Sequence, residues 1–265
     1  METKRVSLID GDSICYIVAW NHEDSLVSLV EQSCDSIVEA ILKNTGATHY
    51  LGTFSSSENF RHREYLVAKY KGNRPPKPEW VREWEMVIKN HLVNKWGFII
   101  PEDLEADDVV ASLSFWNDGN TYIICSPDKD MKQCPGSHFN YSDLSTASVI
   151  EVDNKTAQKN FWTQMLTGDT TDNIKGVPGV GPAKVQKLFE GIDNEIDYYM
   201  AVHEAFKTYY GEYYGPIIYQ ETLTAIQLMG PTHTHWQQHK DYLTQLKEKG
   251  FYPVPIIDHS DVPEI

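Results

Sequence analysis

The chain has 265 residues, and its composition, 41% hydrophobic and 12% aromatic, is typical of a globular protein with a substantial core. This composition excludes an intrinsically disordered chain, and no apolar stretch reaches the roughly eighteen residues of a membrane span. The length suits one large domain or two smaller ones.

The net charge of −15 at neutral pH argues, by itself, against a polyanionic partner. The charge is unevenly distributed, however, because residues 61–95 carry nine Lys and Arg against four Glu. A solvated helix face is one explanation of such a basic segment, and a surface for phosphate groups is the other.

The first part of the chain alternates predicted strands with predicted helices. Apolar runs predict strands at residues 5–9, 48–54 and 121–125, and a strand followed by a turn at 97–101. Helical spacing of apolar residues predicts helices at 25–43, 80–96 and 104–116. This pattern predicts an α/β sheet with acidic residues gathered at strand ends and in first helical turns.

From about residue 155 onward the pattern becomes helical and rich in tyrosine. We therefore expect an α/β catalytic domain over residues 1–155 and a helical domain over residues 156–265, with a loosely held tail from Pro253. No cysteine pair has the spacing of a metal or redox motif, so we expect reduced, buried thiols at Cys15, Cys34, Cys125 and Cys134.

Eight carboxylates fall in four short clusters near predicted strand ends and helix starts. So many acids share a small volume only when divalent cations neutralise them, because like charges otherwise repel or take up protons. Each acid taken alone is also typical of a helix N-terminus or a solvated face. Together they predict a hydrolytic centre with two Mg²⁺ or Mn²⁺ ions. The candidate ligands are Asp10, Glu105, Asp107, Asp108, Asp128, Asp130, Asp169 and Asp172.

A glycine-rich segment follows the last acidic cluster. The spacing of Gly176, Gly179 and Gly181 predicts a tight hairpin that opens a helix carrying Lys184 and Lys187. Exposed backbone N–H groups at such a turn can hold phosphates without contacting bases, although simple turn chemistry also explains the glycines.

Three histidines, His233, His235 and His239, have a spacing that could bind Zn²⁺. The neighbouring Pro231 and the interleaved polar residues favour a loop instead.

These residues resemble the 5′-nuclease family, which includes phage 5′–3′ exonucleases, flap endonucleases and the 5′-nuclease domain of bacterial DNA polymerase I. The resemblance covers roughly residues 5–190, and the stretch from Gly168 to Lys184 is highly specific. The remaining motifs are Ile9-Asp10-Gly11, Asn59-Phe60-Arg61, Tyr70-Lys71-Gly72-Asn73-Arg74, Glu105-Ala106-Asp107-Asp108 and Ser126-Pro127-Asp128-Lys129-Asp130.

The resemblance implies a PIN-like, resolvase-like fold: a mostly parallel central sheet flanked by helices, with a helical arch at about residues 56–95. A helical DNA-binding domain with a helix-three-turn-helix element would follow. By the same resemblance Asp10, Glu105, Asp107 and Asp108 would hold the first ion, Asp128 would lie near both, and the second would be held by Asp130, Asp169 and Asp172.

The resemblance also implies DNA contacts. Lys71 and Arg74 would hold the scissile phosphate and the 5′ strand, Tyr70 could stack on a base, and Arg61 would hold another phosphate. The Gly176–Lys187 hairpin would bind duplex phosphates and a K⁺ ion.

The function implied is a structure-specific 5′–3′ exonuclease and flap endonuclease of DNA replication or repair, acting on DNA with a 5′ flap, nick or duplex end. We expect a cytoplasmic monomer without a membrane partner, in the host cytoplasm if the protein is phage-encoded. Two alternatives stay open: a PIN-like ribonuclease that removes RNA primers from an RNA–DNA hybrid, and a DNA-binding protein that no longer cleaves.

The chain departs from the family pattern at two positions. Ser55 stands where many relatives have an aspartate after the second strand, so the first metal site would lack one acid. Lys175 stands where proline is usual.

Overall fold

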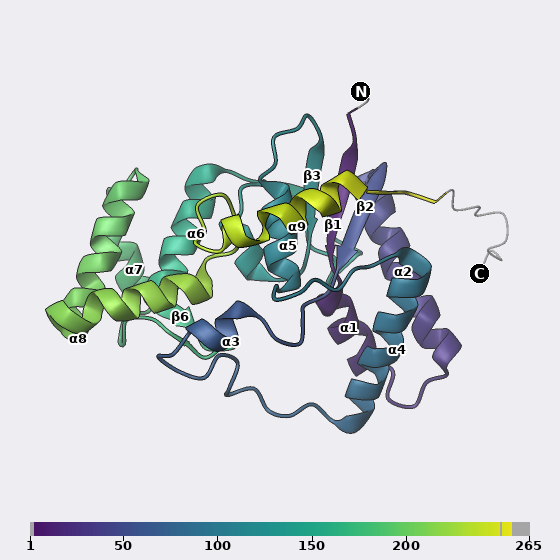
Figure 1. Cartoon of the computed structure of the whole chain (residues 1–265), viewed down its shortest axis with the longest axis horizontal. Coiled ribbons are helices and arrows are strands. Elements are labelled where there is room, and N and C mark those ends of the chain that lie inside the picture. Colours follow the sequence, from purple (N-terminus) through teal and green to yellow (C-terminus); the bar gives the residue numbers. More distant parts are fainter. Residues whose placement is uncertain (1–2, 250, 256–265) are drawn as a thin grey trace.

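The computed structural model describes residues 3–249 and 251–255 and has a six-stranded sheet at its centre (Figure 1). The strand order is β5-β4-β3-β1-β2-β8. Strand β1 lies parallel to β2 and β3, and β3 lies parallel to β4, whereas the outer strands β5 and β8 are antiparallel to their neighbours. The strands are β1 (Arg5–Asp10), β2 (His49–Thr53), β3 (Thr121–Cys125), β4 (Gly136–Phe139), β5 (Val149–Val152) and β8 (Tyr252–Pro253). The predicted α/β class with a mostly parallel sheet is confirmed.

Three helices cover one face of this sheet. They are α1 (Gly11–Trp20), α2 (Val27–Thr45) and α4 (Glu79–Trp96), and their apolar stripes form one core with side chains such as Ile9 and Ile123. Helices α2 and α4 each end at a glycine in the left-handed conformation, Gly46 and Gly97, as helix C-termini often do. The helices predicted at 25–43 and 80–96 are therefore confirmed.

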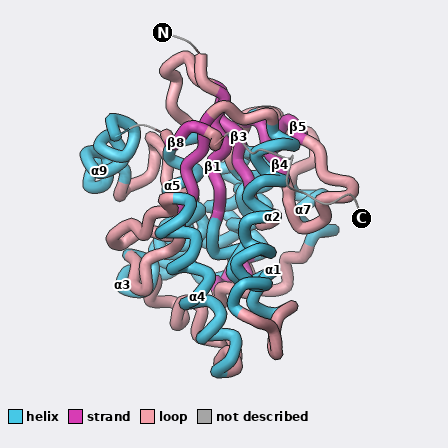
Figure 2. Tube along the Cα trace, turned by 90° about the vertical axis from the view of Figure 1, so that its right-hand side faces the viewer, coloured by secondary structure: helices cyan, strands magenta, loops and turns pink. Residues whose placement is uncertain are grey.

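Helices α5 (Ala106–Ser114) and α9 (Trp236–Lys249) cover the other face (Figure 2). Leu243 and Leu246 of α9 pack in the same core as Leu8 and Val109, and β8 then pairs with β2. The last described part of the chain thus returns to the sheet, which the predicted division at residue 155 did not anticipate.

The remaining elements form a second core beside the sheet, at the left of Figure 1. They are α6 (Asn154–Thr167), the short strands β6 (Gly168–Asp169) and β7 (Ile174–Lys175), α7 (Pro182–Leu188) and α8 (Glu195–Ile226). Helix α8 bends sharply at Gly211, whose φ of 86° lies in the region that glycine reaches without strain. Trp162, Tyr198 and Phe206 are buried between these helices.

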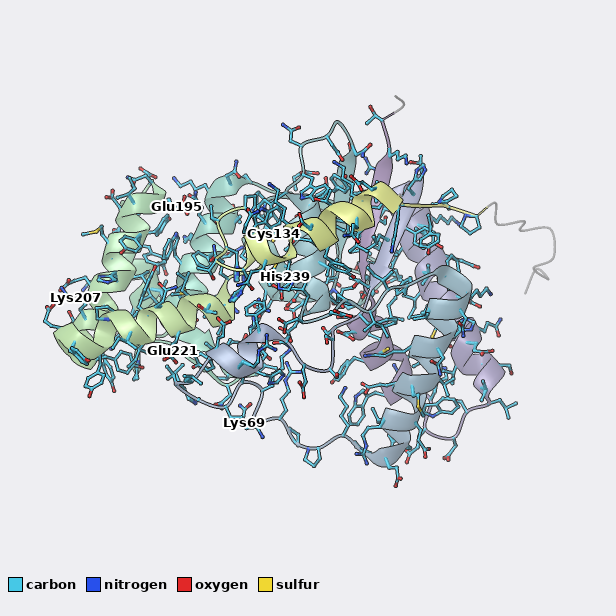
Figure 3. All side chains as sticks on the ribbon, in the orientation of Figure 1. Lys69, Cys134, Glu195, Lys207, Glu221 and His239 are labelled. Carbon is cyan, nitrogen blue, oxygen red and sulfur yellow. The ribbon has the colours of Figure 1, made fainter. Side chains whose placement is uncertain are left out.

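The segment predicted as an arch contains α3 (Phe60–Glu64), a long loop over residues 65–78, and α4. The loop crosses beneath α8, where the backbone N–H of Leu66 donates to Glu221 at 2.9 Å. Figure 3 shows Lys69 on this loop and Glu221 on α8 above it. Tyr65 and Tyr70 of the loop are buried in the second core.

Several local predictions differ from the structure. The strand expected at 97–101 is a single bridge between Ile99 and Thr53, because the chain turns away after one pair of backbone hydrogen bonds. Strands β4 and β5 and the 3-10 helix η1 (Lys129–Gln133) were not predicted. The predicted tail lies, from residue 256 onward, outside the described residues.

Other local predictions are confirmed. All four cysteines are free and buried. His233 and His235 lie in a turn before α9, as expected, and His239 lies in the first turn of that helix. Within the described residues, no helix combines the length and apolar character needed to cross a bilayer.

A buried ion pair between Arg61 and Asp108 joins the two cores. The Arg61 side chain is 1% exposed and that of Asp108 is fully buried. The guanidinium donates to both carboxylate oxygens of Asp108 and to the backbone carbonyls of Ala225 and Gln227, at the end of α8. A charge buried in this way is stable only with its partner in place.

This position corrects the expectation that Arg61 contacts a DNA phosphate. Its N–H groups already bond to Asp108, to Glu105 and to the end of α8, and its side chain is out of reach of solvent. The ion pair instead fixes α3 and α8 against the start of α5.

We predict that Arg61→Met lowers the free energy of unfolding by about 3–5 kcal/mol, because Asp108 is then left buried without a counter-ion. Urea unfolding of the metal-free protein measures this change. Arg63→Met is the matched control, since the Arg63 pair with Asp103 is exposed and little effect is expected. A variant Arg61→Met with wild-type stability and weakened DNA binding would show that Arg61 is a phosphate contact after all.

Candidate metal centre

The first acidic side chain of the centre lies at the end of the central strand. Asp10 closes β1 and caps α1, with Oδ1 accepting from the backbone N–H of Asp12 at 3.0 Å. Its Oδ2 accepts from the hydroxyls of Ser13, at 2.7 Å, and Ser126, at 2.9 Å. Burial, followed by the charge of Asp12, raises the pKa of Asp10 to about 6. Ser126 follows β3, so hydroxyl and carboxylate come from neighbouring parallel strands.

The start of α5 supplies three more acids. Glu105 caps this helix, and oxygen atoms of Glu105, Asp107 and Asp108 all lie within 4.8 Å of one another. Burial and the charges of Glu105 and Asp108 raise the pKa of Asp107 well above its usual value. Asp108 also accepts from the backbone N–H of Met229 at 3.1 Å, in addition to its bonds to Arg61.

The second half of the centre joins η1 to the β6–β7 turn. Asp128 is exposed and caps η1, and Asp169 ends β6. Burial and the charges of Asp128 and Asp169 raise the pKa of Asp130 to about 7. The Oδ1 atom of Asp169 accepts from the backbone N–H groups of Thr171, at 2.7 Å, and Asp172, at 3.1 Å. These turns hold the acids close together despite their repulsion.

Tyr70 connects the two halves. Its hydroxyl lies 2.8 Å from Oε2 of Glu105 and 3.0 Å from Oδ2 of Asp172. The residue is only 3% exposed. This corrects the expectation that Tyr70 stacks on a base, because its ring is buried in the second core and its hydroxyl is hydrogen-bonded to Glu105 and Asp172.

Lys71 and Arg74 are partly exposed and contact carboxylates of the centre. The ammonium of Lys71 bonds to Glu105 and lies 3.8 Å from Oδ2 of Asp172, and the guanidinium of Arg74 bonds to Asp172. The backbone N–H of Lys71 donates to the carbonyl of Asp172 at 2.8 Å. The basic loop is therefore fastened to the last acidic cluster.

Hydrogen bonds between the loop and residues 170–173 strengthen this connection. Asn73 donates to the carbonyl of Thr170 at 2.6 Å, and Asn173 donates to the carbonyl of Lys69 at 2.9 Å. Lys71 and Asn173 both have left-handed backbone conformations, with φ of 54° and 58°. Such conformations in residues other than glycine are uncommon and are maintained by surrounding contacts.

The glycine hairpin begins directly after β7. Gly176 packs against the end of α6, so closely that an added Cβ would lie 2.3 Å from the carbonyl oxygen of Leu166. Gly179 turns the chain with a φ of 75°, and Pro182 opens α7. Lys184 and Lys187 are exposed on that helix. Gly179, Gly181 and both lysines are thus exposed, whereas Gly176 is buried.

No role was predicted from the sequence for Ser126 or for Asp12. Ser126 donates to Asp10 and accepts from the backbone N–H of Asp128 at 3.1 Å. The position of Ser126, directly after a predicted strand and two residues before Asp128, could have indicated from the sequence that it lies beside the acids. Asp12 accepts from the backbone N–H of Ser55, at 2.9 Å.

The residues present fit hard divalent cations. The donors are carboxylate oxygens, the ligands that Mg²⁺ and Mn²⁺ prefer. Burial and neighbouring acids raise the pKa values of Asp10, Asp107 and Asp130, and a cation bound beside them would favour their charged forms. Within the described residues, Glu105, Asp107 and Asp108 form the one group of three or more His, Cys, Asp or Glu with ligand atoms this close together.

Known proteins resemble the chain over most of its length. Residues 5–162 match the family model of the 5′-3′ exonuclease, N-terminal resolvase-like domain. DNA polymerase I of Borreliella burgdorferi is 30% identical over 172 residues, covering 58% of this chain and 18% of that protein. Flap endonuclease Xni of Pseudoalteromonas translucida is 27% identical over 183 residues, covering 63% of this chain and 68% of that protein. The chain spans about a fifth of the length of the DNA polymerases I that it matches.

Solved structures share the fold. A flap endonuclease of bacteriophage T5, in a pseudo-enzyme-product complex with DNA and metal ions, superposes with a TM-score of 0.67 at 15% identity, covering 93% of this chain and 97% of that chain. A T5 protein co-crystallised with metal ions gives 0.65 at 16% identity, with 93% and 98% covered. The family model spans more than half of the chain, and the chain therefore belongs to the family of the 5′-3′ exonuclease N-terminal, resolvase-like domain.

Proposed function

We propose that this protein is a metal-dependent 5′–3′ exonuclease and flap endonuclease that hydrolyses DNA phosphodiesters near junctions of duplex and 5′ single strand, leaving 5′-phosphates, in replication or repair. The observation that carries the proposal is that Tyr70 and Lys71 bring the three acids at the start of α5 together with Asp172 of the β6–β7 turn. The names of the relatives, DNA polymerase I and flap endonuclease, support the same activity.

The proposed metal ligands are those predicted from the sequence. Asp10, Glu105 and Asp107 would hold one Mg²⁺ or Mn²⁺, with Asp128 near both ions, and the second would be held by Asp130, Asp169 and Asp172; Asp108, which was predicted for the first ion, is the exception. Two such ions supply positive charge that activates water and stabilises the leaving oxygen of a phosphodiester. Both carboxylate oxygens of the fully buried Asp108 accept from Arg61, so we propose that Asp108 positions the start of α5 and does not bind an ion.

Lys71 and Arg74 are the proposed phosphate contacts. Their side chains are 25% and 47% exposed, so both remain accessible to solvent while they contact the acids. Positive groups held in place at a reacting phosphate stabilise the charge that develops on it. Tyr70 positions Glu105 and Asp172 relative to each other and does not touch the substrate.

The Gly176–Lys187 hairpin is the proposed duplex contact. Backbone N–H groups and the exposed Lys184 and Lys187 can bind phosphates of any sequence, and backbone carbonyls of the turn would bind K⁺. We further propose that the protein acts as a cytoplasmic monomer and also accepts an RNA strand paired with DNA. The ribonuclease and cleavage-free alternatives are not favoured by the relatives.

We predict that Asp130→Asn and Asp169→Asn each reduce cleavage of a labelled 5′-flap DNA in Mg²⁺ by about 10²-fold or more, because each removes a ligand charge where the reaction needs it. Mapping the products on flap, nicked and blunt duplexes measures both rate and cleavage position. Asp193→Asn, an exposed acid paired with Lys155 on the second core, is the control and should cleave as wild type does. Wild-type rates in both centre variants would refute the assigned roles.

We predict that Lys184→Ala weakens duplex binding to a similar extent for all sequences and lowers the slope of log affinity against log salt by about 0.9, as expected for the loss of one phosphate contact. Fluorescence anisotropy in Ca²⁺, at several salt concentrations, measures the slope. Lys240→Ala, an exposed lysine on α9, is the control. An unchanged slope, or a loss confined to one DNA sequence, would contradict the proposed contact.

A further inference from the structure

Asp12 places a carboxylate beside Asp10, at the ends of the two central strands. It lies in the first turn of α1, and its side chain is 36% exposed. Its Oδ2 atom accepts from the backbone N–H of Ser55 at 2.9 Å, just beyond the end of β2. Strands β1 and β2 are parallel, with Asp10 opposite Thr53, so the two carboxylates meet at the same edge of the sheet.

Ser55 forms a structural hydrogen bond and is not a charged metal ligand. Its hydroxyl oxygen accepts from the backbone N–H of Ala106 at 3.0 Å, at the start of α5. Ser55 therefore connects β2 to the helix that carries Asp107, but it brings no negative charge. The charge at this edge comes from Asp12, which reaches the backbone of residue 55 from the next element.

The surroundings of Asp10 and Asp12 contain little positive charge. Within the described residues, the recorded partners of the Asp10 carboxylate are two hydroxyls and backbone N–H groups, all neutral. The cation recorded at Asp12 is Lys89, whose Nζ lies 3.4 Å from Oδ1 and whose side chain is 33% exposed. An ion pair this exposed contributes little to stability, so another cation can replace it at low cost.

Asp10 differs from Glu105 and Asp172 in its contacts with cations. Glu105 and Asp172 are in contact with Lys71, Arg74 or Arg61, whereas no such cation is recorded at Asp10 in the part of the chain that the structure describes. Two carboxylates at one sheet edge, with one partly exposed lysine recorded at Asp12, provide oxygen donors and excess negative charge, as a divalent cation requires.

We propose that Asp12 is a ligand, direct or through water, of the ion held by Asp10, and that it supplies the carboxylate that residue 55 lacks. The inference rests on the proposed function, since it assumes that the centre binds divalent ions. In this chain the ligand would be Asp12, on α1, and not residue 55, which follows β2.

Binding of Mn²⁺ to the DNA-free protein tests the proposal without reference to activity. Titration calorimetry, with electron paramagnetic resonance of free Mn²⁺, gives the number of ions and their affinities. Asp12→Asn should weaken one Mn²⁺ site by roughly tenfold or more and leave the other unchanged. Adding Ser55→Asp to that variant should restore the affinity, because an aspartate there can supply the missing carboxylate and still accept from Ala106.

Lys89→Met is the matched control, because it removes the ion pair but keeps the carboxylate. It should bind Mn²⁺ as tightly as wild type or more tightly. Thermal unfolding without metal checks that each variant is folded. If Asp12→Asn is not folded, Asp12→Glu, which keeps the charge but displaces it, takes its place and should also bind Mn²⁺ more weakly.

The outcomes separate the two proposals. Wild-type Mn²⁺ affinity in the folded Asp12 variant, or an equal loss in Lys89→Met, would overturn the role of Asp12 and leave the proposed function intact. A wild-type protein that binds no Mn²⁺ would instead contradict the proposed function itself.

Discussion

Repulsion between crowded carboxylates is the constraint on which the rest of the structure depends. The pKa of Asp10 is raised to about 6 and that of Asp130 to about 7, because burial and neighbouring acids oppose their charged forms. The fold nevertheless holds these groups together with backbone N–H donors, hydroxyls and a few cations. Crowded acids of this kind lower the stability of the folded protein. Groups with shifted pKa values cluster at binding and catalytic sites.

The basic residues that reduce this repulsion are of two kinds, buried and partly exposed. Arg61 is buried and bonds to Asp108 and to the end of α8, so its role is structural. Lys71 and Arg74 are partly exposed, so their contacts with Glu105 and Asp172 can be exchanged for others. The basic segment at residues 61–95 is therefore not one uniform DNA surface.

The parallel strands and the second core determine where the acids and their hydrogen-bond partners lie. The ends of β1, β2 and β3 bring Asp10, Ser55 and Ser126 to one edge of the sheet. The second core brings Asp172 close to Glu105, because the Tyr70 hydroxyl bonds to both and Lys71 bonds to Glu105 and lies 3.8 Å from Asp172. Helix α9 covers the face of the sheet opposite α1, α2 and α4.

The sequence by itself determined the fold class, the main helices and strands of the α/β part and the acidic motifs, because hydrophobic periodicity and short motifs are local properties. Tertiary structure alone decided the roles of Arg61, Tyr70, Asp12 and Ser55. Each depends on a partner far along the chain, Asp108, Asp172, Ser55 and Ala106 respectively. A local pattern records the charge or size of a side chain, but burial and partnership arise only when distant segments pack together.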